Sequence, residues 1–142
     1  MRADEMVIYS DFDGTIASGP GMQAIVCSEN IEAIKSFIKA GGKFGMASGR
    51  NHQSIDTLIG EEIFNMPYVE SNGALVYDKQ TDSYISQLFL DQVFKEYAYD
   101  FAKRNHLFLT ALDKNDSHRL IFNDESDKII FDYNRDLMTY ED

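Results

Sequence analysis

Cysteine is nearly absent, because the 142-residue sequence contains only Cys27. A lone cysteine excludes an internal disulfide and is typical of a reducing compartment. No histidine or metal-ligand spacing accompanies Cys27. We therefore expect it to pack as a small apolar residue rather than to react.

Positive charge is also scarce. Lys and Arg number 13 against 24 Asp and Glu, which gives a formal net charge of -11. Such a field repels nucleic acid and anionic membrane surfaces, and the sequence has no basic cluster to override it. We expect no nucleic-acid partner, and an anionic substrate would need local positive charge from a metal ion or a helix N-terminus.

Targeting and membrane-spanning segments are missing too. The stretch "MRADEMVIYS" carries charges before a short apolar run, so it is neither a signal peptide nor a membrane span. The sequence shows no internal repeat or low-complexity segment. We expect a soluble, cytoplasmic protein with no membrane partner, and its 44% hydrophobic residues suffice for a sizeable core.

The first 72 residues alternate strands with helices. Short apolar runs predict strands near residues 6–10, 43–48 and 68–71, and the first should be buried on both faces of a parallel sheet. Between them, helices are predicted over residues 28–42, with Ser28 as the N-cap, and over 49–60. This order is typical of a doubly wound α/β sheet.

The pattern changes after Asn72. Two strands around "KQTD" predict a hairpin, and a helix follows over residues 91–106 with Asp91 as its cap. We expect an apolar stripe on this helix to pack inward, and further strands near residues 107–112, 118–123 and 128–134. The stripe consists of Phe94, Tyr97, Ala98 and Phe101. The sequence thus predicts a parallel α/β piece over residues 1–72 and an α+β piece over 73–142.

Two acidic residues follow the first predicted strand in "VIYSDFDGTI". Asp11 and Asp13 are two positions apart, which places them together on one face of an extended chain. Like charges this close repel, so the arrangement indicates a cation or a proton-transfer task. Gly14 permits the sharp turn that follows, and Thr15 can hold it by hydrogen bonding.

A second polar group, "ASGR", ends the next predicted strand. The carboxyl ends of parallel strands form the usual ligand site of such sheets, so Ser48 and a helix N-terminus can meet an anion there. Two carboxylates, a divalent cation, a hydroxyl and backbone N–H groups suit phosphoryl transfer.

These segments carry a resemblance to a known family. "DFDGT" after an apolar strand resembles the first motif of the haloacid dehalogenase superfamily, and "ASGR" resembles the second motif of its Cof-type phosphatases, with Ser48 in place of threonine. "SNGALVYD" is similar to the segment that leads from core to cap in that subgroup. The resemblance implies a doubly wound parallel core over residues 1–72 and part of an inserted α+β cap over 73–142.

The resemblance also implies an activity, which is Mg²⁺-dependent hydrolysis of small phosphorylated metabolites, with sugar phosphates favoured. Asp11 would be the nucleophile that forms an aspartyl-phosphate and would bind Mg²⁺. Asp13 would act as general acid and then base, and would give its main-chain carbonyl to the metal. The remaining residues implied are phosphate-binding Thr15, Ser48 and Gly49, and substrate-binding Arg50 and Asn72.

The sequence departs from the family in two respects. A lysine motif and an acidic "GDxxxD"-like motif cannot be placed in it. We therefore expect an incomplete core whose first strand has an uncovered edge, and self-association through that edge. The alternative function is that of an inactive, truncated fragment acting as a binding or oligomerising module.

Simpler interpretations of single residues stay open. The aspartate pair could be a helix cap and a solvated turn residue, Ser48 could be a helix N-cap, and Arg50 could form a surface ion pair. The three histidines lack ligand spacing to one another, so we expect surface or loop positions for His52, His106 and His118. A receiver-type domain phosphorylated on Asp11 fits less well, because such domains do not use this "DGT" turn.

Overall fold

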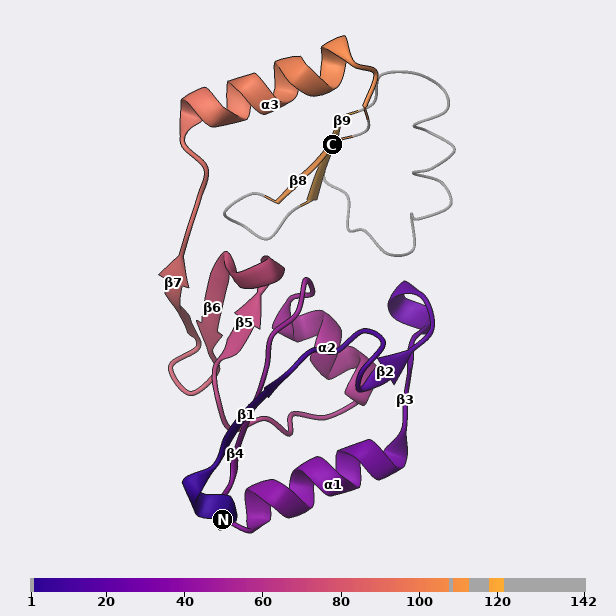
Figure 1. Ribbon diagram of the computed structural model, residues 1–142, viewed down its shortest axis with the longest axis vertical. Helices are drawn as coiled ribbons and strands as arrows, with labels where there is room; N and C mark the ends of the chain where they lie inside the picture. The colour runs from indigo at the N-terminus through magenta and orange to yellow at the C-terminus, as the bar shows by residue number, and fades with distance from the viewer. Residues whose placement is uncertain (1, 108, 113–117, 122–142) are drawn as a thin grey trace. The chain divides into compact units, whose positions relative to one another are not determined.

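The computed structural model describes residues 2–107, 109–112 and 118–121. The chain divides into two compact units, residues 1–88 and 89–142 (Figure 1).

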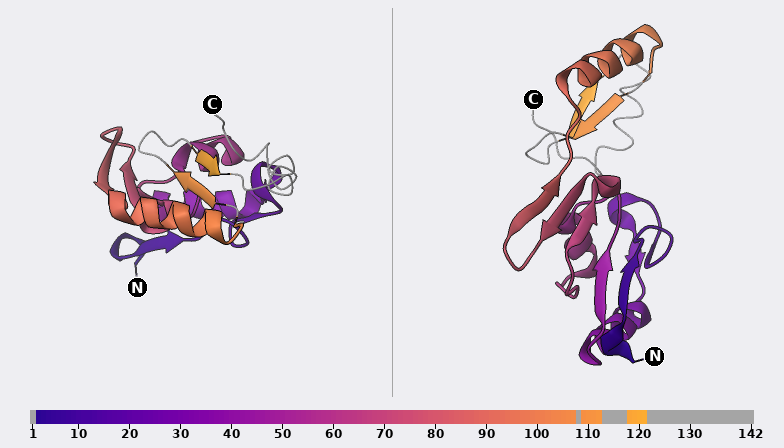
Figure 2. Two further views of the ribbon diagram at one scale, coloured as in Figure 1. Left: turned by 90° about the horizontal axis from the view of Figure 1, so that it is seen from above. Right: turned by 60° about the vertical axis from the view of Figure 1, so that its left-hand side comes forward.

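A pair of parallel strands organises the first unit. Strand β1 (Val7–Ser10) lies beside β4 (Lys43–Met46), with Ile8 opposite Phe44 and Ser10 opposite Met46. Figure 2 shows the two strands running in the same direction. The crossover between them contains helix α1 (Ser28–Lys39). The predicted α/β organisation is therefore confirmed, and both strands end at the same edge.

The start of α1 corrects two expectations. Cys27, not Ser28, occupies the N-cap, and it makes no side-chain capping bond. The Ser28 hydroxyl donates instead to Glu29 Oε2 at 3.0 Å, and the Cys27 thiol donates to the same oxygen at 2.6 Å. Cys27 is exposed rather than packed, because Glu29 draws both side chains to the outer surface. The helix ends before Gly41, whose φ of 94° requires a residue without a side chain.

The segment expected to be a plain loop after "DFDGT" forms a small ribbon. Strands β2 (Ala17–Ser18) and β3 (Ile25–Val26) pair antiparallel around the 3-10 turn η2 (Gly21–Gln23). Ala17 and Ala24 are buried, so this ribbon packs onto the core through small side chains. A further 3-10 turn, η1 (Ala3–Glu5), precedes β1.

Helix α2 (His52–Ile59) follows β4. Its N-cap is Asn51, whose side chain accepts from Ser54 N at 2.9 Å, so the alternative role of Ser48 as N-cap is wrong. The helix ends at Gly60 in the left-handed conformation, with φ at 79°. Ile55, on its inner face, is fully buried.

The third predicted strand pairs differently from expectation. Strand β5 (Tyr68–Glu70) touches β4 through a single parallel bridge between Ala47 and Val69. Its main partner is the predicted hairpin of β6 (Leu75–Asp78) and β7 (Ser83–Gln87), in the antiparallel order β5-β6-β7. Residues 73–88 therefore belong to the first compact unit, and a cap over residues 73–142 remains a prediction.

Aromatic and aliphatic side chains from both sheets form one core. Its largest fully buried members are Phe12, Met46, Ile55 and Tyr68, together with the carboxylate residue Glu70. Strand β1 is less covered than expected, since Val7 is 57% and Tyr9 42% exposed. Among the described strands β1 pairs with β4 alone, which leaves one edge and part of one face open.

The second unit contains helix α3 (Gln92–Arg104). Asp91 is its N-cap, as expected, and its side chain accepts from the backbone N–H of Phe94 at 2.8 Å. Strands β8 (Leu109–Leu112) and β9 (His118–Ile121) pair antiparallel. The strand predicted near residues 128–134 lies outside the described residues. Among the described residues, no helix combines the length and apolar character needed to cross a membrane.

The aromatic stripe of α3 is not packed as expected. The rings of Phe94, Tyr97 and Phe101 contact one another along the helix, with centroids 6.1 to 6.3 Å apart, but all three are exposed. The buried residue of the helix is Ala102.

Candidate active site

The turn after β1 is fixed by one buried ring. Phe12 is fully buried, and its carbonyl accepts from the backbone N–H groups of Ile16 at 3.0 Å and Ala17 at 2.9 Å. Because Phe12 points into the core, its two neighbours Asp11 and Asp13 are exposed. The apolar anchor thus presents two carboxylates to solvent at the end of the strand.

Backbone contacts close this turn. Gly14, with φ at 76°, donates to the carbonyl of Ala17 at 2.8 Å, and Thr15 N lies 3.3 Å from the carbonyl of Phe12. The Thr15 hydroxyl makes no hydrogen bond within the described part of the chain. Its expected role in holding the turn is therefore taken by the main chain.

Asp11 has one occupied oxygen. Its Oδ1 accepts from the Phe12 backbone N–H at 2.7 Å, which fixes the carboxylate plane. Its other oxygen, Oδ2, accepts no hydrogen bond from the described residues. With Oδ1 held by the main chain, Oδ2 of this exposed residue is left for a nucleophilic or metal-binding role.

Ser48 lies at the corresponding end of β4. Its backbone N–H donates to Val69 O at 2.9 Å, and its buried hydroxyl accepts from Arg50 N at 3.2 Å. A hydroxyl that accepts keeps its own proton to donate. Ser48 is therefore held by two strands, with a donor available for an anion.

Asn72 is brought to this edge by the 3-10 turn η3 (Ser71–Gly73), in which its φ is 55°. Its backbone N–H donates to Ser48 O at 3.1 Å. A β-carbon placed on Gly49 would lie 3.2 Å from Asn72 Oδ1, so these two residues are neighbours. The structure thus brings Asn72, Ser48 and Gly49 together.

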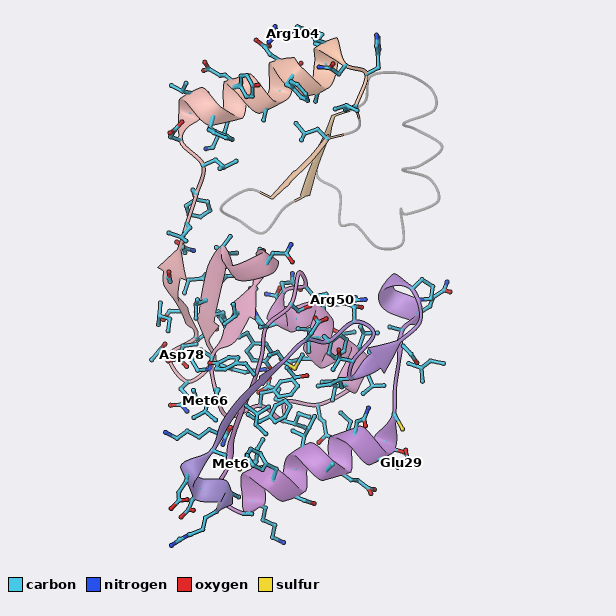
Figure 3. All side chains as sticks on the ribbon, viewed as in Figure 1. Met6, Glu29, Arg50, Met66, Asp78 and Arg104 are labelled. Atoms are coloured by element: carbon cyan, nitrogen blue, oxygen red, sulfur yellow. The ribbon has the colours of Figure 1, made fainter. Side chains whose placement is uncertain are left out.

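Arg50 joins the two strand ends. Its Nε donates to Asp13 Oδ2 at 2.8 Å and its Nη2 to Asp13 Oδ1 at 2.6 Å, in a two-pronged ion pair. Nη2 also donates to Gly21 O at 2.9 Å. The hydrogen bond to Asp13 raises the pKa of the Arg50 guanidinium, so it stays charged. Figure 3 labels Arg50 in the first unit.

The expectation for His52 is wrong. The residue is buried, its ring stacks on Tyr77 with centroids 3.6 Å apart, and its Nδ1 lies 2.7 Å from Glu70 Oε1. The same Glu70 oxygen accepts the His52 backbone N–H at 2.8 Å, at the start of α2. The sequence signal that could have indicated this pair is Glu70 itself, an acidic residue in the otherwise apolar strand β5. A carboxylate buried in such a strand requires a hydrogen-bond partner.

A metal ion would find part of a site. Within residues 2–107, 109–112 and 118–121, no group of three or more histidine, cysteine or acidic residues could enclose one. Asp11 offers the kind of oxygen donor that Mg²⁺ prefers, and Mg²⁺ takes only one or two carboxylates from many proteins. These oxygen donors are of the type that Mg²⁺ prefers, but they would fill only part of its coordination shell.

The fold and these strand ends define an α/β protein with paired aspartates after its first strand. Residues 8–141 match the family model of haloacid dehalogenase-like hydrolases. The chain belongs to this family, as its motifs predict.

Solved structures share the fold. The haloacid dehalogenase subclass IIB sugar phosphatase BT4131 is 20% identical, with a TM-score of 0.68 over 89% of this chain and 47% of that one. The phosphatase BT1666 from Bacteroides thetaiotaomicron is also 20% identical, with a TM-score of 0.71 over 96% of this chain and 49% of that one. The chain thus spans about half the length of these structures.

The match to a curated relative covers a smaller part of this chain. MG265 of Mycoplasma genitalium, a protein with a provisional phosphatase name, is 38% identical over 71 residues. That match covers 50% of this chain and 24% of the relative.

The buried pair gives a stability prediction. Replacing Glu70 by alanine leaves the His52 ring and the first N–H of α2 without their acceptor, so the free energy of unfolding should fall by about 3 kcal/mol or more. The matched change Glu61→Ala breaks an exposed ion pair with Lys35 and should cost about 0–1 kcal/mol. Urea denaturation of both variants measures the difference, and equal small losses would contradict the buried role.

Proposed function

We propose that the protein is a phosphatase of small phosphorylated metabolites, with sugar phosphates the favoured class. The observation that supports this most is the pair of exposed aspartates on either side of buried Phe12, at the same sheet edge as the Ser48 hydroxyl. The structural likeness to a sugar phosphatase supports the substrate class.

The proposed reaction has two steps. Asp11 Oδ2 attacks phosphorus while the bond to the leaving oxygen breaks, and that oxygen takes a proton from Asp13. Water then attacks phosphorus of the aspartyl-phosphate and gives a proton to the Asp13 carboxylate. The bond from phosphorus to Asp11 Oδ2 breaks, inorganic phosphate leaves, and both residues are restored. The Ser48 hydroxyl, the Thr15 side chain and the backbone N–H of Gly49 hold the phosphoryl oxygens.

The substrate and a metal complete the proposal. Asn72 lies beside Gly49, where it can contact the organic part of the substrate. The family resemblance implies the same contact for Arg50. Asp11, and the main-chain carbonyl of Asp13, would hold Mg²⁺, which supplies positive charge against phosphate in a chain of net charge -11. The exposed Cys27 thiol suits a reducing compartment, and we place the protein in the cytoplasm.

Asp11→Asn should abolish hydrolysis, since an amide does not attack phosphorus. The measurement is phosphate release from an aryl phosphate in the presence of Mg²⁺. Asp100→Asn, on the exposed surface of α3, is the matched control and should keep full activity. Substantial turnover by Asp11→Asn would exclude this residue as the nucleophile.

Asp13→Asn should slow turnover mainly for esters with poor leaving groups, because those depend on the proton from Asp13. Rates are compared on an aryl and an alkyl phosphate. A loss at least tenfold larger on the alkyl ester is expected, since general acid–base catalysis contributes roughly 10²- to 10⁴-fold. The role fails if both esters lose the same factor.

A second candidate function is that of an oligomerising module, and one observation favours it. Among the described strands, β1 has a neighbour on one side only, and Val7 and Tyr9 on this strand are exposed. Pairing of two such edges would hide both.

We therefore predict dimers or larger species in sedimentation velocity at micromolar concentration. Val7→Lys should dissociate them, because a charge on an edge strand opposes pairing. Val93→Lys makes the same change at a 77% exposed position of α3 and should leave the association unchanged. A strictly monomeric wild-type chain would exclude this candidate.

A further inference from the structure

We propose that Arg50 is a positioning residue, which holds the Asp13 carboxylate in place and fastens the Gly21 segment to it. The proposal rests on the proposed function for the catalytic role of Asp13. The contacts of Arg50 themselves do not depend on that function. It assigns Arg50 a task different from contact with the substrate.

The contact with Asp13 has the geometry of a strong ion pair. Both carboxylate oxygens receive a guanidinium N–H, at 2.6 and 2.8 Å, in the fork arrangement that fixes orientation as well as distance. The Arg50 side chain is only 15% exposed, and its guanidinium carbon lies 5.7 Å from the centre of the Phe12 ring. Reduced exposure to water makes such a pair worth more than one on the open surface.

The fork leaves Asp13 able to exchange a proton. A carboxylate offers about four lone-pair positions, and these two hydrogen bonds use two of them. A general acid must lie within hydrogen-bond reach of the leaving oxygen, which an exposed aspartate on a turn cannot ensure by itself. Arg50 supplies that restraint, and its fixed charge stabilises the carboxylate that remains once the proton has left.

The same side chain extends the restraint to the ribbon. Nη2 reaches the carbonyl of Gly21, whose φ of 48° lies in the left-handed region, so the η2 turn is tied to the Asp13 turn. Nη1 lies 3.5 Å from the Ser54 hydroxyl on α2. The aspartate turn, the η2 turn and the start of α2 therefore meet at one guanidinium.

The test is amide hydrogen exchange at Ala17, Gln23 and Ala24, read by NMR on the full chain. Their N–H groups bond to Phe12 O, Pro20 O and Gly21 O within the two turns. We expect Arg50→Gln to accelerate exchange at these amides roughly tenfold or more, the scale of lost charged hydrogen bonds. At Ala17, in the aspartate turn, Asp13→Asn should do the same, and the double variant should exchange no faster there than either single one.

Arg2→Gln is the matched control. Arg2 makes the same fork, with Nε and Nη2 at 3.1 and 2.6 Å from the two oxygens of Asp4, but on the exposed surface. Its loss should leave the exchange at Ala17, Gln23 and Ala24 unchanged. Arg50→Lys keeps the charge without the fork and should exchange as fast as Arg50→Gln.

Several results would overturn the proposal. The first is an Arg50→Gln effect at Ala17 that Asp13→Asn does not share. The second is additive effects at Ala17 in the double variant, and the third is an equal effect of Arg2→Gln. These readouts need no turnover, so a chain that hydrolyses no phosphate ester would defeat the proposed function while the exchange data still decide the role of Arg50.

Kinetics add a second readout where turnover is measured. A positioning role predicts that Arg50→Gln lowers kcat more on an alkyl than on an aryl phosphate, with KM unchanged, as in Asp13→Asn. A rise in KM that is equal for both esters would show substrate contact instead and would overturn the proposal.

Discussion

The parallel pairing of β1 with β4 is the constraint on which the rest of the site depends. It brings Ser10 opposite Met46, and the ladder continues as Ala47 N donates to Ser10 O at 2.9 Å. Two polar segments, which begin at Asp11 and at Ser48, 37 residues later in the sequence, therefore lie at the same edge. Phe12 then determines how the first segment turns, because burying its ring exposes the acidic residues before and after it.

Polar contacts between side chains also hold this edge together. Glu70 is fully buried, and its Oε1 is hydrogen-bonded to both the ring Nδ1 and the backbone N–H of His52. Strand β5 is therefore held to the start of α2. Arg50 connects the same region to the aspartate turn. Such groups are costly to bury without partners, so each one restricts the arrangements that the chain can adopt.

The sequence predicted what depends on neighbouring residues. The strand–helix alternation, the hairpin around "KQTD" and the Asp91 cap follow from local patterns, and the family motifs named the two aspartates. It missed what depends on distant partners. The sequence around His52 does not show that Glu70, 18 residues away, will lie beside it. The cap of α1 was missed for a local reason, because Glu29 accepts hydrogen bonds from the Ser28 and Cys27 side chains. The antiparallel pairing of β5 with β6 was likewise not predicted from the residues of β5.

The central claim is that the ends of β1 and β4 form one anion site. An NMR titration of the chain with inorganic phosphate in the presence of Mg²⁺ tests it most directly, because the amides of both segments are observed together. The account predicts that residues 11–15 and 48–50 shift with a single binding constant, while α3 does not respond. Shifts confined to one of the two segments, or different constants for each, would contradict it.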